Sequence, residues 1–323
     1  GESNGKLWKS VDGGTNWAMT GDASFQSMNT RVRDLKFIGT NTLLAATSDG
    51  LFRSTDGGAS WTDVHPGEHM EIEIKPNDPA ILYSVKLVGS KTEFYKSEDT
   101  GLTWTLKPIG WPAPANGDEQ KRCEISVSAA NPNLVYVLAS GDVGPDGGLY
   151  GIYKSTDAGE TFSFECCEGA PGGAPTVTNP NILGWSEDGT GDGGQYYYDL
   201  ALGASPTDSD RLFGAGINVW RSLNGGSDWT INGHWVTWVQ SGGLKHRYSH
   251  ADVHDIKFFD NGSSIDMWVA SDGGLFYSAS QGDTLEPRMH GIHGRLCYGR
   301  GNLSQWNTDS IQRHLQRRAS KSK

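Results

Sequence analysis

A histidine and aspartate pattern near the C-terminal end is the densest set of side chains that could do chemistry. His250, Asp252 and His254 alternate along the sequence, and alternation along a β-strand places such residues on one face. Two imidazoles and a carboxylate can bind a metal ion or form a hydrogen-bonded His–Asp pair. The spacing matches no known metal signature, so we expect no metal and predict a polar binding surface.

A short repeated motif forms the framework around these residues. Six segments follow the pattern of an aromatic residue, then Lys, Arg or Tyr, then Ser-x-Asp-x-Gly-x-x-aromatic, which we call the box; the fifth has Asn in place of Asp, and the last keeps only Ser278 and Gly282. A short Asp side chain accepts hydrogen bonds from nearby backbone N–H groups, and Gly adopts positive φ at no steric cost, so each box predicts a tight turn. We expect the box aspartates (Asp12, Asp56, Asp99 and Asp157) to be structural. The segments begin at Trp8, Phe52, Tyr95, Tyr153, Trp220 and Phe276.

Between the boxes, five segments start with an acid and continue with alternating apolar residues, a period that predicts β-strands. A repeat of ~40–45 residues with four strands has the size of a propeller blade. We therefore predict an all-β fold, a β-propeller of four-stranded antiparallel blades, incomplete and with five to six blades, in residues 1–286. The five segments begin at Asp34, Glu71, Glu124, Asp199 and Asp255.

The innermost strand of a propeller blade lines the central channel, so residues just before each strand acid should converge there. Convergent polar and aromatic groups at a concave mouth are the default hypothesis for a binding site. The alternative is that they only solvate the channel. The predicted substrate-binding residues are Arg31, Arg33, His69, Arg122, Tyr196, Tyr198, His250, Asp252 and His254.

The boxes and their spacing resemble those of the Asp-box (BNR-repeat) β-propellers over about residues 5–286. That group includes sialidases, xyloglucanase-type glycosyl hydrolases and sortilin-like receptors. The resemblance implies that the boxes lie on the outer rim, away from the ligand channel. It specifies the fold and leaves the function open.

The resemblance also implies a catalytic pair. Glycoside hydrolysis generally uses two carboxylates. The segment around Asp272 is similar to a xyloglucanase segment in which an Asp before two glycines is catalytic, and the segment that starts at Asp199 is similar to the one holding the partner acid. We predict Asp272 and Asp199 as catalytic residues. Asp49 repeats the first motif in another blade, so the motif could instead belong to blade architecture. A sialidase would need three arginines and a nucleophilic Tyr, and its usual F/Y-R-I-P motif is absent.

Composition limits the partners. The net charge of −11 disfavours nucleic acid as a partner, because nucleic acid is bound mainly by Lys and Arg. The sequence has no run of ~18 apolar residues, so it predicts no membrane-spanning helix. Two functions remain: a secreted or cell-surface propeller that binds or hydrolyses a polysaccharide or other glycan, or a sortilin-like propeller that captures a protein or peptide. We expect no cofactor. Ca²⁺ near Asp188 and Asp192 is a separate hypothesis, because carboxylates and carbonyls are its ligands.

The last part of the chain differs from the rest. After residue 286 the boxes stop and basic residues predominate, so we predict that residues 287–323 form a poorly packed basic tail. The four cysteines (Cys123, Cys166, Cys167 and Cys297) show no C-x-x-C spacing, which disfavours zinc. They allow at most two disulfides and leave the redox compartment open.

Overall fold

The computed structural model describes residues 7–22, 25, 30–114, 117–142, 148–167, 175–191, 193–236, 240–241, 244–245 and 247–288. The described residues form two compact units. The first contains those up to Val88 together with Glu93–Leu106, and the second contains Gly89–Thr92 and those from Lys107 onward. In this part of the chain, no helix has the length and apolar character that a membrane crossing requires.

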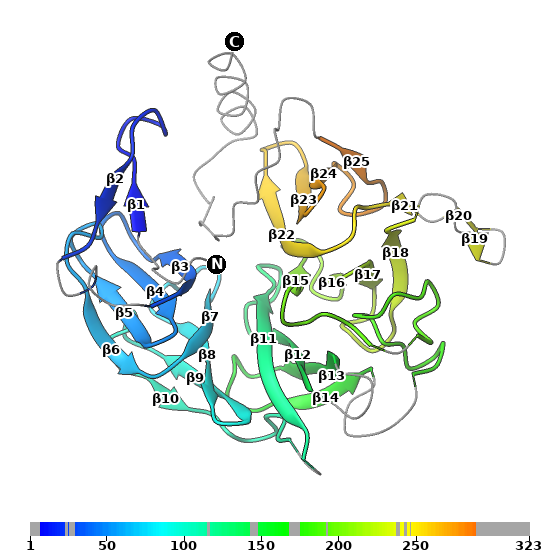
Figure 1. Ribbon diagram of the computed structural model, residues 1–323, viewed down its shortest axis with the longest axis horizontal. Coiled ribbons are helices and arrows are strands. Elements are labelled where there is room, and N and C mark those ends of the chain that lie inside the picture. Colours follow the sequence, from blue (N-terminus) through cyan, green and yellow to red (C-terminus); the bar gives the residue numbers. More distant parts are fainter. Residues whose placement is uncertain are drawn as a thin grey trace. The chain divides into compact units, whose positions relative to one another are not determined.

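The first unit starts with a hairpin of two strands, β1 (Leu7–Lys9) and β2 (Ala18–Thr20). Two four-stranded antiparallel sheets follow (Figure 1). The strands of one sheet are β3 (Val32–Phe37), β4 (Leu43–Thr47), β5 (Gly50–Ser54) and β6 (Thr62–Pro66). Those of the next are β7 (His69–Ile74), β8 (Leu82–Val88), β9 (Lys91–Ser97) and β10 (Thr105–Leu106).

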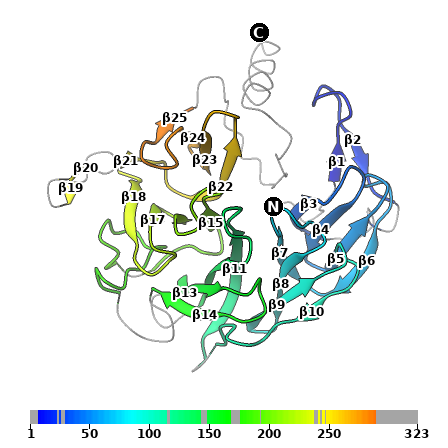
Figure 2. The same ribbon diagram turned by 180° about the vertical axis from the view of Figure 1, so that it is seen from behind.

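The second unit has two further four-stranded sheets and one five-stranded sheet, in each of which the strands are paired in sequence order (Figure 2). The first sheet contains β11 (Glu119–Val127), β12 (Val135–Asp142), β13 (Gly148–Ser155) and β14 (Ser163–Cys166). The second contains β15 (Ala201–Ala204), β16 (Leu212–Ala215), β17 (Val219–Ser222) and β18 (Thr230–His234), with β21 (Arg247–Tyr248) added in parallel. The third contains β22 (Val253–Asp260), β23 (Ile265–Ser271), β24 (Gly274–Ser278) and β25 (Glu286–Pro287). A small hairpin pairs β19 (Gln240–Ser241) with β20 (Leu244–Lys245).

The predicted all-β class and the four-stranded antiparallel sheets are confirmed by this topology. In each of the five four-strand repeats the third strand ends at the serine of a box, so the predicted box turn follows that strand. These third strands are β5, β9, β13, β17 and β24.

The box turn is closed by its own side chains. In the second copy, Ser54 Oγ donates to Asp56 Oδ1 at 2.8 Å and accepts from the Gly58 N–H at 2.9 Å. Asp56 Oδ1 also accepts from the Ser60 N–H at 2.9 Å, and the Trp61 indole donates to the Gly58 carbonyl at 3.1 Å. The box carboxylate is therefore used inside the turn.

Box aromatics are core residues where a neighbouring element covers them. Trp61 and Trp229 are 7% and 5% exposed, and the Trp61 ring stacks on Phe25 with centroids 5.1 Å apart. Trp17, at the same box position in the β1–β2 hairpin, is 50% exposed. This difference shows that burial of the box aromatic depends on packing outside the box.

The basic residue that follows the first aromatic connects one box to the next. Lys9 Nζ donates to the carbonyl of Gly57 at 2.8 Å, and Arg53 Nε donates to the carbonyl of Thr100 at 3.0 Å. In the second unit, Arg221 pairs with Asp283 at 2.6 Å. Successive turns within a unit are thus bonded to each other.

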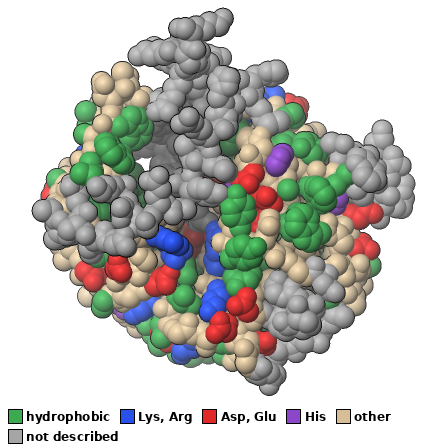
Figure 3. Space-filling view, in the orientation of Figure 1, with side chains coloured by type: hydrophobic (Ala, Val, Ile, Leu, Met, Phe, Trp, Pro, Cys, Tyr) green, Lys and Arg blue, Asp and Glu red, His purple; other side chains and the backbone are tan. Residues whose placement is uncertain are grey.

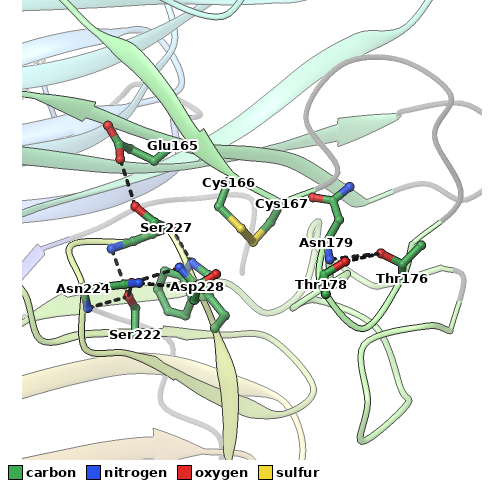
Figure 4. Close-up of a disulfide and its surroundings, with 12 residues drawn as sticks. Glu165, Cys166, Cys167, Thr176, Thr178, Asn179, Ser222, Asn224, Ser227 and Asp228 are labelled. Carbon is green, nitrogen blue, oxygen red and sulfur yellow. Dashed lines mark hydrogen bonds between the residues drawn. A yellow bond between two sulfur atoms is a disulfide. The ribbon is translucent and has the colours of Figure 1, made fainter.

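A disulfide joins the adjacent residues Cys166 and Cys167 at the end of β14. Figure 4 shows it near the fifth box, where Ser227 donates to Glu165 at 3.3 Å. Both half-cystines are buried in an apolar cluster with Ile182 and Leu183. Because the two cysteines are adjacent, the disulfide cross-links no distant segment, and it is the packing of their side chains that anchors the end of this blade in the core of the second unit.

Candidate functional site

Six polar side chains gather in the second unit and form what we call the carboxylate cluster. They come from three segments: the turn before β15, the start of β22, and the loop between β23 and β24. In Figure 3, acidic side chains lie beside hydrophobic ones on the face over β22 and β15. The members are Gln195, Tyr198, Asp199, Asp252, His254 and Asp272.

A β-bulge sets the position of His254. Val253 pairs with Ser271 and Asp255 pairs with Ala270, so His254 is an extra residue in β22. Bulges re-aim a side chain and are frequent next to functional sites. Strands β3 and β7 have the same irregularity directly before the predicted acids Asp34 and Glu71, and β11 has one at Lys121, three residues before Glu124. The bulge is therefore a property of the blade that this site uses.

Asp272 accepts hydrogen bonds on both carboxyl oxygens. Its Oδ1 lies 2.7 Å from His254 Nε2, and its Oδ2 accepts from the Tyr198 hydroxyl at 2.8 Å. A carboxylate has no hydrogen to donate, so next to an ionised Asp272 the donor of the 2.7 Å bond is an Nε2–H of His254. The rings of Tyr198 and His254 meet edge to face with centroids 5.1 Å apart. The contact between the two rings thereby helps to orient both Tyr198 and His254 toward Asp272.

Steric crowding explains why the residue directly after Asp272 is a glycine. A β-carbon at Gly273 would lie 2.2 Å from the ring of His250, a distance that no side chain can occupy. Ser271 pairs with Gly274, so Asp272 and Gly273 alone form the β23–β24 loop. The Asp-Gly pair thus admits the imidazole of His250 against the loop that carries the carboxylate.

Asp199 is the most buried acid of the cluster. It is 1% exposed, its Oδ2 accepts from Gln195 Nε2 at 3.1 Å, and its Oδ1 has no hydrogen-bond partner among the described residues. Burial, with a further contribution from the negative charge of Asp252, raises the pKa of Asp199 to about 7. A neutral Asp199 at mildly acidic pH follows from this environment.

Asp252 is held in an unusual backbone conformation. Its φ of 64° lies in the left-handed region, which Asp tolerates better than most residues. Its Oδ1 accepts from Gln195 Nε2. Burial and then the charge of Asp272 raise the pKa of Asp252, and the influence of His254, Gln195 and His250 opposes this rise. Two acids with raised pKa values therefore lie beside a carboxylate with two donors.

Arg122 and Tyr196, predicted to bind substrate, are bonded within the protein. The Arg122 guanidinium donates to the carbonyls of Tyr196 at 3.2 Å and Leu200 at 3.4 Å, and to Glu124 Oε1 at 3.0 Å. The Tyr196 hydroxyl donates to Asp142 Oδ1 at 2.6 Å. In the structure both residues hold the segment that carries Tyr198 and Asp199.

Three predicted binding residues lie in the first unit. Arg33 forms an ion pair with Glu68, and Arg31 is exposed, with its backbone N–H bonded to Ser48 at 3.0 Å. His69 is fully buried between His65 Nδ1 at 2.9 Å and Ser84 Oγ at 2.8 Å. Burial, and then the charges of His65 and Lys86, lowers the pKa of His69 to about 2.

Of the two predicted Ca²⁺ ligands, Asp188 lies among the described residues. Within the described ranges, no three His, Cys, Asp or Glu side chains are placed to hold a metal ion. The Asp188 carboxyl accepts from the N–H of Thr190 at 3.0 Å and from its hydroxyl at 2.7 Å. Asp192, the second predicted Ca²⁺ ligand, lies outside the described residues, as do Cys297 and the tail from residue 289 onward.

Sequence reasoning missed Gln195, Glu124 and Asp142. Gln195 bridges two acids, Glu124 orients Arg122, and Asp142 fixes the hydroxyl of Tyr196. Gln195 and Asp142 stand outside the strand-acid pattern. Glu124 was assigned only as a strand acid, although its place two residues after Arg122 on the same strand could have suggested the pair.

No protein-family model matches the sequence, and no curated protein matches it. Among solved structures, an ancestral GH74 enzyme is similar with a TM-score of 0.56 and 16% identity over 89% of this chain and 35% of that enzyme. YCF48 bound to D1 peptide is similar with a TM-score of 0.50 and 18% identity over 89% and 76% of the two chains. A protein of unknown function from Bacteroides thetaiotaomicron VPI-5482 has a TM-score of 0.50 and 14% identity over 76% and 54%.

The chain thus spans about a third of the length of the GH74 enzyme. At such identities, structural likeness establishes the fold and not the activity. Its repeated four-stranded antiparallel sheets and these neighbours together identify the chain as a β-propeller.

Proposed function

We propose that this chain is a glycan-directed propeller of the Asp-box type and that its carboxylate cluster hydrolyses a glycosidic bond. The observation that carries the proposal is the contrast between neighbouring acids. Asp272 accepts two hydrogen bonds as a carboxylate, whereas Asp199 and Asp252 lie in environments that raise their pKa values. A pair of acids with opposed environments is the usual arrangement for general acid and base roles.

The chemistry follows from these states. A neutral carboxyl from the Asp199 and Asp252 pair would protonate the glycosidic oxygen as its bond to the anomeric carbon breaks. Asp272 would accept the proton of the attacking water, since a carboxylate has acceptor sites beyond the two that Tyr198 and His254 occupy. The products would be a reducing sugar end and a free hydroxyl.

The test is hydrolysis of a panel of neutral and acidic polysaccharides, followed by release of reducing ends. Asp272→Asn should lower kcat/KM by about 100-fold or more, the usual contribution of general acid–base groups. Asp49→Asn is the matched control, because Asp49 occupies the equivalent β4–β5 loop in the first unit. The control variant should keep full activity. Equal losses in the two variants would mean that the Asp-Gly loop has only a structural role.

A second candidate function is capture of a protein or peptide, as in sortilin-like receptors. The similarity to a propeller solved with a peptide supports it at the level of fold. Binding without turnover, unchanged by Asp272→Asn and Asp199→Asn, would favour this function over hydrolysis.

We also propose that the protein is secreted or exposed at a cell surface. The Cys166–Cys167 disulfide supports this location, because disulfides persist mainly in oxidising compartments. Mass spectrometry of the purified native protein, alkylated without reduction, should find these two cysteines unmodified.

A further inference from the structure

The side-chain amide of Gln195 joins two of the acids. Its Nε2 donates to Asp199 Oδ2 at 3.1 Å and also to Asp252 Oδ1. An amide nitrogen carries two hydrogens, so one N–H can serve each carboxyl. The backbone carbonyl of Gln195 accepts from the N–H groups of Tyr198 at 2.7 Å and Asp199 at 3.1 Å. The bridge is therefore fixed at both its backbone and its side chain.

The two bridged acids differ in access to solvent. Asp199 is 1% exposed, and a group so enclosed cannot reach a glycosidic oxygen without movement of its surroundings. Asp252 is partly exposed, and its backbone carbonyl accepts from the N–H of Asp272 at 3.1 Å. Asp252 is thus the accessible member of the pair, at the edge of the loop that carries Asp272.

We propose that Asp252 gives its proton to the substrate, while Asp199 and Gln195 are positioning residues that hold the Asp252 carboxyl and set its protonation. The inference rests on the proposed hydrolytic function. The unpartnered Oδ1 of Asp199 supports it, because a carboxyl oxygen buried without a donor favours the neutral acid. Neutral Asp199 then spares Asp252 a second negative neighbour.

Charged groups on neighbouring segments affect the ionisation of both Asp252 and Asp199. Asp272 of the β23–β24 loop disfavours ionisation of Asp252, and His254 on β22 and His250 before it favour ionisation. Arg122 on β11 favours ionisation of Asp199. Because Asp199 is neutral where Asp252 titrates, Asn in place of Asp199 should leave the acidity of Asp252 nearly unchanged, whereas removing the Gln195 donor should make Asp252 less acidic.

The proposed step balances as follows. The bond between the anomeric carbon and the glycosidic oxygen breaks, its electron pair stays on that oxygen, and the oxygen takes the proton of Asp252. Water forms the new bond to the anomeric carbon and loses one proton to Asp272. Exchange with solvent then returns a proton to Asp252 and removes one from Asp272.

The experiment compares aryl glycosides with good and poor leaving groups, since a good leaving group needs no acid. Asp252→Asn should lower kcat at least about 100-fold on the poor leaving group and less than about 10-fold on the good one. Asp199→Asn, which keeps a neutral group at that position, should keep most activity on both and leave the alkaline limb of the pH profile nearly in place. Gln195→Met, similar in length, should lower kcat and move that limb to higher pH.

The opposite pattern would overturn the proposal. If Asp199→Asn shows the leaving-group dependence and Asp252→Asn does not, the buried acid is itself the proton donor. If the wild-type chain hydrolyses no glycoside, the proposed function fails, and carbon-13 NMR titration of the aspartate carboxyls then tests the bridge alone. A titration midpoint of Asp252 that is the same in wild type and Gln195→Met would refute the bridge.

Discussion

At the scale of single residues, Asp199 couples stability to pH. Its pKa rises from 3.8 in an unfolded chain to about 7 in the fold. Between these values the folded state keeps a proton that the unfolded state has lost, so the free energy of unfolding falls as pH rises. Asp199→Asn mimics the neutral acid and should gain about 1–2 kcal/mol relative to wild type between pH 4.5 and 6.5. Urea unfolding at both pH values measures this difference, and a constant difference would contradict the assignment.

His69 should give the opposite pH response. Its pKa falls from 6.5 to about 2 in the fold, so below pH 6.5 the unfolded chain binds a proton that the folded chain refuses. Stability is then lost as pH falls. Relative to His69→Gln, the wild type should lose about 2 kcal/mol of unfolding free energy between pH 6.5 and 5. Asp199 and His69 change the free energy of unfolding in opposite directions as pH changes. The free energy of unfolding of the wild type should therefore depend less on pH than its difference from either Asp199→Asn or His69→Gln.

The residues of the candidate site differ in how far sequence could predict them. His254 and Asp272 stand in recognisable patterns, and the structure brings them together at 2.7 Å. Arg33 and His69 satisfy the same positional rule, but in the first unit they meet Glu68, His65 and Ser84. Gln195 is set by the fold of a long insertion, for which the sequence offers no period. Local sequence patterns locate residues on the strands and in the short turns between them. They do not locate residues in the long insertion.

At the scale of elements, the fifth box shows why its Asn is suited to its place. Asn224 Nδ2 donates to Asp228 Oδ2 at 2.7 Å. Asn224→Asp restores the common box residue but places two carboxylates next to each other at the surface, so it should destabilise the protein by about 0.2–1 kcal/mol at neutral pH. Thermal unfolding at pH 7 measures the loss.

A second change in the same turn provides the control. Thr103 and Thr161 occupy the place of Asp228 in the third and fourth boxes and donate to their box aspartates at 2.6 and 2.7 Å. Adding Asp228→Thr to Asn224→Asp should therefore recover the lost stability. A double variant as unstable as the single one would show that charge repulsion is not the cause.

The elements themselves were largely predictable. Box and strand periods place the third strand of each four-stranded sheet, because turn chemistry and alternation are local properties. The bulges of β3, β7, β11 and β22 were not predictable, since a bulge is a mismatch between two strands and neither sequence alone reveals it.

At the scale of the whole molecule, equivalent tryptophans should contribute very differently to stability. Trp229 is 5% exposed in the main core of the second unit, whereas Trp17 is 50% exposed. Trp229→Ala should cost about 3–5 kcal/mol, and Trp17→Ala less than about 1 kcal/mol. Chemical denaturation of both variants tests this contrast. Equal losses would mean that the box position, and not its packing, determines the contribution.

The hydrogen bonds from Lys9 to Gly57 and from Arg53 to Thr100 should also determine how local unfolding propagates along the first unit. Each turn is held partly by a cation from the preceding turn, so a blade that opens removes a support from its neighbour. Repeat proteins with such nearest-neighbour terms unfold cooperatively along the array. Under mechanical load, the first unit should therefore yield in one event that runs from the β1–β2 hairpin onward, and not as separate ruptures of single blades.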